Sequence, residues 1–126
     1  MNKLFVSVPM RGKTDEEIKK SIDKMHKIAE AVFDQKLDLI DSFFEGGLEV
    51  PEGCNERMYS LGESIKLISQ ADYYIGVSVL GDYPGCAIEN IVAAKYGAEC
   101  GLERYYIDAN APFLMLNKEE EYCVRV

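Results

Sequence analysis

Long apolar runs, paired cysteines and clusters of basic residues are all missing from this sequence of 126 residues. No apolar run approaches the roughly 20 residues that a helix needs to cross a bilayer. The four cysteines form no CxxC pair and there is one histidine, so the ligand spacing of a zinc site is absent. The formal net charge of -8 argues against duplex DNA or an anionic membrane as a partner, because both attract clusters of Lys and Arg.

Targeting and repeat signals are also absent. The opening residues MNKLFVSV form too short an apolar run, and turn polar too soon, for a signal peptide. Unpaired cysteines are typical of the reducing cytoplasm, so we expect a cytoplasmic protein. The sequence holds no internal repeat, linker or low-complexity tract, and 48% of its residues are hydrophobic. We therefore expect a single domain over residues 1–126 with one ordinary core.

What the sequence does contain is an alternation of strand and helix patterns. Runs rich in β-branched and aromatic residues predict strands, and amphipathic stretches predict helices. The predicted strands are 3–8, 37–40, 73–79, 104–107 and 113–116, and the predicted helices are 15–34, 55–70 and 86–97. Such alternation favours parallel βαβ units with right-handed crossovers. We expect an α/β fold: a three-layer, doubly wound parallel sheet of the flavodoxin or Rossmann-like type, with strand order 2-1-3-4-5.

Local signals add detail around the first two helices. Thr14 and Glu17 have the spacing of a capping box at a helix start. His26 lies off the apolar stripe of that helix, so we expect it on the solvated surface. The polar, glycine-rich segment 41–54 is predicted to be a loop above the edge of the sheet, where it could act as a lid.

Two loops and one carboxylate mark a candidate site. Residues 9–13 and 80–85 carry the Pro and Gly of turns. In the expected order the first and third strands are neighbours at the switch point, so these loops face one crevice. Glu89 is expected in the first turn of a helix that starts at Cys86, where free N–H groups and the helix dipole favour an ionised carboxylate. Glu89 is therefore a candidate nucleophile; the structural alternative is that it only complements the dipole, which is worth ~0.3–1 kcal/mol.

Three segments, in the order LFVSVPMRG, ISQADYYIG and PGCAIENIVAAKYG, resemble the nucleoside 2-deoxyribosyltransferase-like superfamily. They are similar to its glycine-containing first loop, its "ADxxI/V" strand entry and its "E-x-x-x-A…G" helix. The Arg-Gly pair in the first segment most resembles the 2′-deoxynucleoside 5′-monophosphate N-glycosidase branch. Two places depart from the pattern: Glu63-Ser64 stands where relatives often carry a further acidic residue, and Pro84-Gly85-Cys86 stands where they often have Ser-Gly or Gly-Val-Gly.

The resemblance implies hydrolysis or transfer at the N-glycosidic bond of a (deoxy)nucleoside or its 5′-monophosphate. Glu89 would be the nucleophile that forms a covalent glycosyl intermediate, and Asp72 would position or protonate the base. The chemistry needs no metal and no organic cofactor. Relatives usually form dimers or larger assemblies, which implies a homo-oligomer. The residues expected to bind substrate are Ser7, Pro9, Met10, Arg11 and Gly12 in the first loop, and Ser78, Asp82, Tyr83 and Gly85 around the second.

Two other functions stay open from the sequence. The first is a non-catalytic module that senses or sequesters a nucleotide in the same crevice, which the two departures from the family pattern allow. The second is related glycosidic cleavage of a nicotinamide or cyclic-dinucleotide-like ligand. In each case the expected partner is a small molecule, and neither a nucleic acid polymer nor a membrane.

Overall fold

The computed structural model describes residues 1–43, 48–78, 83–108 and 116–117. Strands and helices alternate along most of the chain, as the sequence pattern predicts. Three helical segments, α3, η1 and α4, follow one another without a break, and η1 is a π-helical turn. In chain order the elements are β1 (Lys3–Ser7), α1 (Asp15–Phe33), β2 (Asp38–Leu39), α2 (Glu56–Ile68), β3 (Tyr73–Ser78), α3 (Pro84–Val92), η1 (Ala93–Gly97), α4 (Ala98–Cys100), β4 (Glu103–Asp108) and β5 (Leu116–Asn117).

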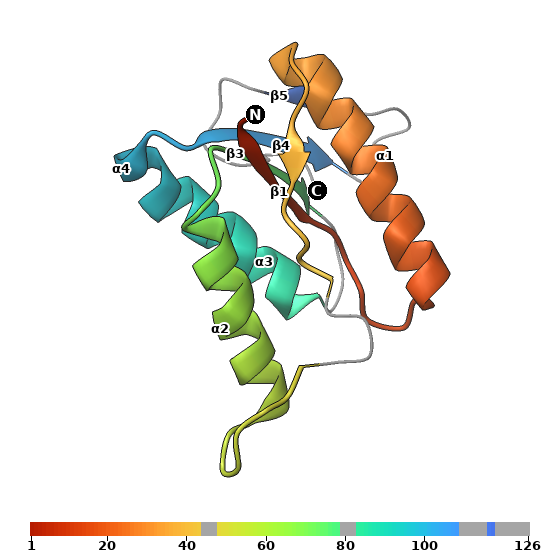
Figure 1. The fold of residues 1–126 in the computed structure, drawn as a ribbon, viewed down its shortest axis with the longest axis vertical. Helices are drawn as coiled ribbons and strands as arrows, with labels where there is room; N and C mark the ends of the chain where they lie inside the picture. The colour runs from red at the N-terminus through yellow and green to blue at the C-terminus, as the bar shows by residue number, and fades with distance from the viewer. Residues whose placement is uncertain (44–47, 79–82, 109–115, 118–126) are drawn as a thin grey trace.

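The sheet has the strand order β2-β1-β3-β4-β5, which confirms the predicted order. Strands β2, β1, β3 and β4 are parallel, whereas the short β5 pairs antiparallel with β4. Helix α1 covers one face of the sheet, and α2 and α3 cover the other (Figure 1). The α/β class and the flavodoxin or Rossmann-like layering are therefore confirmed. Most of the predicted last strand, 113–115, lies outside the described residues.

The face under α1 is a core of aliphatic and aromatic side chains. Helix α1 buries Ile18, Ile22, Met25, Ala29 and Phe33 at helical spacing, and these pack on alternate residues of β1, β3 and β4. The predicted capping box is present, because the Glu17 backbone N–H donates to Thr14 Oγ1 at 3.2 Å and the Thr14 N–H donates to Glu17 Oε1 at 2.9 Å. The apolar stripe and its cap together fix α1 on this face.

The opposite face packs three aromatic rings against small helical residues. Phe5 and Tyr74 stack with ring centroids 5.8 Å apart, and Tyr106 lies 5.9 Å from Tyr74. Ala93 and Ala94 of η1 are buried against this cluster. Small side chains let the helix approach the sheet closely, and this closeness brings the start of α3 to the carboxyl edge of β1 and β3.

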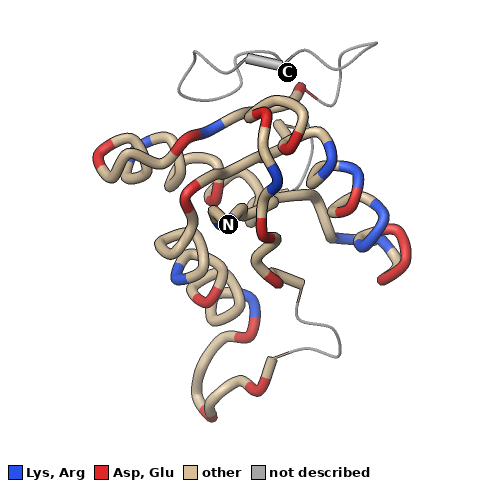
Figure 2. Tube along the Cα trace, turned by 45° about the horizontal axis from the view of Figure 1, so that its top comes forward, with Lys and Arg blue, Asp and Glu red and all other residues tan. Residues whose placement is uncertain are grey.

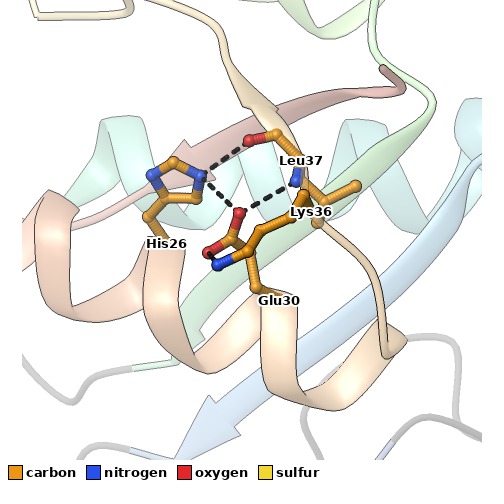
Figure 3. Close-up of polar contacts among 4 residues, drawn as sticks. All are labelled: His26, Glu30, Lys36 and Leu37. Carbon is orange, nitrogen blue, oxygen red and sulfur yellow. Dashed lines mark hydrogen bonds and ion pairs between the residues drawn. The ribbon is translucent and has the colours of Figure 1, made fainter.

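His26 is partly buried rather than solvated, which corrects the expectation for it. Its Nε2 lies 2.8 Å from the Leu37 carbonyl oxygen and 3.5 Å from Glu30 Oε2 (Figure 3). Glu30 also accepts a hydrogen bond from the Leu37 backbone N–H at 2.9 Å, and this bond lowers the pKa of Glu30. These contacts tie the turn before β2 to helix α1, so His26 has a structural setting away from the crevice.

The charged residues are mixed in sign along the helices and strands. Figure 2 shows basic positions on α1 interspersed with acidic ones. Within the described parts of the chain, no helix has both the length and the apolar character to span a membrane.

Candidate functional site

A cavity of about 720 Å³ opens at the carboxyl end of β1. Its walls come from the loop after β1, the residues after β2, helix α2 as far as Ser64 and the start of α3. This is the crevice beyond the strand ends where open α/β sheets bind ligands. The volume lies within the range of about 300–1,000 Å³ that is typical of small-molecule sites.

Glu89 lies in the wall of this cavity, but on the second turn of its helix. Helix α3 begins at Pro84, with no acidic residue in its first turn, so the expected start at Cys86 was wrong by two residues. Proline is common at the first helical position, since its missing N–H is not needed there. The argument that free N–H groups hold Glu89 ionised therefore does not apply.

Burial raises the pKa of Glu89, while hydrogen bonds from Ser7 and Ser64 act against this rise. The Ser7 hydroxyl donates to Glu89 Oε1 at 2.6 Å, and Ser64 belongs to α2 on the facing side of the cavity. The carboxyl group is thus held by two hydroxyls from two different elements. Burial therefore favours the neutral form of Glu89, whereas the sequence predicted conditions that favour the ionised carboxylate.

Behind Glu89 lies a small polar cluster within the sheet–helix interface. Ser7 Oγ lies 3.3 Å from Cys86 Sγ, and the Cys86 thiol donates to the Val77 carbonyl oxygen at 3.1 Å. Tyr74 donates to Asn90 Oδ1 at 2.5 Å. Burial raises the pKa of both Cys86 and Tyr74, so both groups are protonated at neutral pH.

The first loop reaches the cavity only in part. Pro9, Met10 and Arg11 line it, and their binding of substrate stays a prediction. Ser7 is buried and holds Glu89, so it acts through the carboxyl group and not as part of the lining. Gly12 is exposed, lies outside the lining and has φ of +76°. Its place in the sequence reflects a turn that other residues rarely adopt.

Of the residues predicted to bind substrate around the second loop, some line the cavity and others do not. Tyr83 and Gly85 line the cavity, and their role in binding substrate stays a prediction. Ser78 ends β3 beside Asp108 of β4 and is not among the lining residues. Asp82 lies outside the described residues.

Asp72 is at the wrong edge of the sheet for the role predicted for it. It is exposed, and its Oδ2 accepts a hydrogen bond from the Lys3 backbone N–H at 2.9 Å. This contact lies at the amino ends of β1 and β3, whereas the cavity lies at the carboxyl end of β1. The six residues of β3 put roughly 20 Å between the two edges. Asp72 therefore joins strands and does not contact a base held beside Glu89.

The sequence patterns missed one wall of the cavity. Ser60 and Ser64, four residues apart on α2, line it together with Asn55 and Arg57 at the start of that helix. Their spacing places both serines on one helical face, which was a usable signal. Gly62 and the mixed polarity of the segment obscured that signal.

Ser42, which follows β2, is a further lining residue that the sequence did not single out. It is 5% exposed, and within the described part of the chain its hydroxyl has no hydrogen-bond partner. A buried hydroxyl without a partner costs about 1–3 kcal/mol. A ligand group or a water molecule in the cavity would remove that cost.

Over residues 1–43, 48–78, 83–108 and 116–117, no three His, Cys, Asp or Glu side chains come together in a way that could hold a metal ion. The cavity lining offers two carboxyl groups, those of Glu56 and Glu89, several hydroxyls and two guanidinium groups. Comparison with known proteins adds no further assignment, since no family model, curated protein or solved structure matches the chain.

Proposed function

We propose that this protein cleaves the N-glycosidic bond of a (deoxy)nucleoside or its 5′-monophosphate, by hydrolysis or by transfer to a second base. The observation that carries the proposal is the Glu89 carboxyl group, which lies in the wall of a cavity of about 720 Å³ and is held by Ser7 at 2.6 Å. The resemblance of three segments to the nucleoside 2-deoxyribosyltransferase-like superfamily supplies the reaction class.

In the proposed reaction the ionised Glu89 attacks the anomeric carbon of the sugar. A bond forms between a carboxylate oxygen and that carbon, while the carbon–nitrogen bond breaks and its electron pair leaves with the base, which takes up a proton. Water or a second base then displaces the carboxylate and restores Glu89. A covalent intermediate divides one difficult step into two easier ones, and the bonds from Ser7 and Ser64 keep the carboxylate in one orientation.

The cavity walls suit a nucleoside with a charged end. Val8, Phe43 and Leu61 provide apolar surface, while Tyr83 offers a ring beside the start of α3. Arg11 and Arg57 also line the cavity, and a guanidinium group binds phosphate through paired hydrogen bonds. We assign the apolar surface to the base and the guanidinium groups to a 5′-phosphate where one is present.

The experiment is base release from a panel of deoxynucleosides and their 5′-monophosphates, followed by chromatography. We expect release by the wild type and a fall of about 10⁴-fold or more in Glu89→Ala, as is typical when a catalytic nucleophile is removed. Glu99→Gln, at an exposed carboxylate on α4, is the matched control and should match the wild type. Equal turnover by wild type and Glu89→Ala would remove Glu89 from the mechanism.

One observation favours a second candidate, a module that binds a nucleotide without cleaving it. Burial raises the pKa of Glu89, and a neutral carboxyl group donates a hydrogen bond but does not attack carbon. Tight binding by calorimetry, with no base released over a long incubation, would support this candidate over the glycosidase.

The proposal includes self-association. Met58, Ile91 and Tyr96 are large apolar side chains with 74%, 58% and 68% of their surface exposed. They belong to α2, α3 and η1, on the face opposite α1. Light scattering on the purified protein should give the mass of a dimer or a larger homo-oligomer, and a monomer mass at high concentration would contradict this part.

A further inference from the structure

Behind the candidate nucleophile runs a chain of hydrogen-bonding groups that ends at an asparagine. The Ser7 hydroxyl is 2.6 Å from Glu89 Oε1. Ser7 is paired in register with Gly76 of β3, and the Tyr74 hydroxyl lies over Gly76, 3.0 Å from the position of a Cβ there. This geometry puts the Tyr74 hydroxyl beside Ser7 as a hydrogen-bond partner. Tyr74 Oη is 2.5 Å from Asn90 Oδ1, and Asn90 Nδ2 is 3.1 Å from the Val77 carbonyl oxygen. The order of groups is therefore Glu89, Ser7, Tyr74, Asn90 and the backbone of β3.

Donor and acceptor chemistry assigns the hydrogens along this chain. A carbonyl oxygen only accepts, so the NH₂ group of Asn90 faces Val77 and its Oδ1 faces Tyr74. Oδ1 also only accepts, so the single hydrogen of the Tyr74 hydroxyl points toward Asn90. Tyr74 Oη is then left to Ser7 as an acceptor.

Ser7 also has one hydroxyl hydrogen, and its direction depends on the charge of Glu89. An ionised Glu89 accepts that hydrogen. A neutral Glu89 that carries its hydrogen on Oε1 donates it to Ser7 Oγ. The Ser7 hydrogen then turns to Tyr74 Oη, a stronger acceptor than Cys86 Sγ, which lies 3.3 Å from Ser7 Oγ. Ser7 and Glu89 stay in contact in both states. Ser7 can accept from neutral Glu89 because Asn90 accepts the Tyr74 hydrogen, which leaves Tyr74 Oη free to accept the hydrogen of Ser7.

The side chains of Asn90 and Tyr74 pack against the backbone of Gly76 in β3, where the absence of a side chain leaves room for them. A Cβ at Gly76 would lie 2.1 Å from Asn90 Oδ1 and 2.8 Å from Tyr74 Cε1. The Tyr106 hydroxyl lies 3.4 Å from the Asn90 carbonyl oxygen. The amide of Asn90 thus packs on the bare backbone of β3, in a pocket that admits no side chain at residue 76.

We propose that Asn90 is a positioning residue for Glu89: by fixing the direction of the Tyr74 hydroxyl, it lets Ser7 donate to the charged form of Glu89 and accept from the neutral form. The inference rests on the proposed function, in which the buried Glu89 must lose its proton before its carboxylate can attack the sugar. Asn90 acts through Tyr74 and Ser7 and does not contact the substrate.

The direct test is the titration of the Glu89 carboxyl carbon by ¹³C NMR in the ligand-free protein, with Glu89→Gln used to assign the signal. In Asn90→Ala the Tyr74 hydrogen turns to Ser7, so Tyr74 no longer accepts the Ser7 hydrogen. Only the weak acceptor Cys86 Sγ then competes with Glu89 for that hydrogen, and the charged form of Glu89 is favoured. We expect the midpoint to move roughly half to one pH unit lower. In Asn90→Asp the acceptor for Tyr74 remains and a like charge is added, so the midpoint should not fall.

A double-mutant cycle separates this role from a purely structural one. Tyr74→Phe should also lower the midpoint, because neutral Glu89 loses the acceptor for the Ser7 hydrogen. Adding Asn90→Ala to Tyr74→Phe should then change nothing further. Equal, additive shifts in both backgrounds, or the same downward shift in Asn90→Ala and Asn90→Asp, would overturn the inference. Thermal unfolding of each variant confirms that the titrated protein is folded.

The other titratable groups near Glu89 are common to the proteins compared, except that the Tyr74→Phe variants lack the Tyr74 hydroxyl. They are Cys86 on α3 and Tyr74 on β3, with Arg11, Arg57 and Glu56 in the cavity lining. The test does not depend on activity. If the wild type releases no base but the midpoints move as stated, the proposed function fails and the positioning role stands. If base is released and the Asn90→Ala midpoint is unchanged, the positioning role fails alone.

Discussion

The two faces of the sheet are built from the same strands but bury different chemistry. Side chains alternate along each strand, so Leu4 and Val6 of β1 pack under α1, while Phe5 and Ser7 face α2 and α3. The face under α1 stays apolar along β1, from Leu4 to Val8. The other face changes from an aromatic ring to a hydroxyl as β1 approaches its carboxyl end.

This change of polarity along one face places the site. The residues of β3 on the same face as Phe5 and Ser7 are Tyr74, Gly76 and Ser78. In β4 they include Tyr106 and Asp108. A buried polar group is costly unless it is hydrogen-bonded, and the groups behind Glu89 are bonded to one another and to Val77. The difference between the faces indicates that one supplies stability and the other supplies the candidate chemistry.

The largest expected effect tests the face under α1. Ile22→Ala removes a side chain that is 7% exposed, and such truncations cost about 2–5 kcal/mol. We expect this loss in the free energy of unfolding by urea, with kcat/KM unchanged where the variant is fully folded. A large loss of kcat/KM in the folded variant would contradict the division between the two faces.

Ser7→Ala tests the other face and should give the converse result. It removes a hydrogen bond to a charged group, which is worth about 1.5–3 kcal/mol, so kcat/KM should fall roughly 10- to 100-fold. Because the Ser7 bond lowers the pKa of Glu89, the acidic limb of the pH profile should move to higher pH. An acidic limb that stays in place would contradict the contact as a determinant of Glu89 ionisation.

Glu89→Gln should stabilise the protein at neutral pH, by less than Ile22→Ala destabilises it. Burial raises the pKa of Glu89, so the folded state holds a proton that the unfolded chain has released. Wild-type stability therefore falls as pH rises from the unfolded pKa of about 4.3 through the raised folded value. Chemical denaturation should show a gain for Glu89→Gln at pH 7 that disappears below about pH 4. A gain that is equal at both pH values would rule out ionisation as its cause.

The smallest expected effect is at the cap of α1. Thr14→Ala removes the side-chain acceptor for the Glu17 N–H, and such changes cost ~1 kcal/mol. We expect this loss in thermal unfolding and no change in base release. A change in kcat/KM would connect the face under α1 to the site.

Most of the fold follows from patterns that span a few residues. The apolar stripe from Ile18 to Phe33 and the Thr14 cap determine α1 locally, and alternation with short strands predicts the sheet order. The antiparallel direction of β5 has no comparable signal, because two residues pair with β4 through tertiary context.

The site was less predictable because it depends on register between distant segments. Ser7 and Glu89 are 82 positions apart, and their contact requires the start of α3 to be known to within a turn. Counting Pro84 as a loop residue misplaced that start. Asp72 shows the opposite error, since a match to a family motif gave a role that its place at the amino edge of β3 does not allow.

The most direct test of the central claim is the mass of the protein during turnover of a slow substrate. A deoxynucleoside carrying fluorine at C2′ slows attack on the intermediate, so the protein should gain the mass of one glycosyl group, and peptide mapping should place that mass on Glu89. Glu89→Gln should gain nothing. Base release without any adduct, or an adduct on another residue, would contradict a covalent role for this carboxyl group.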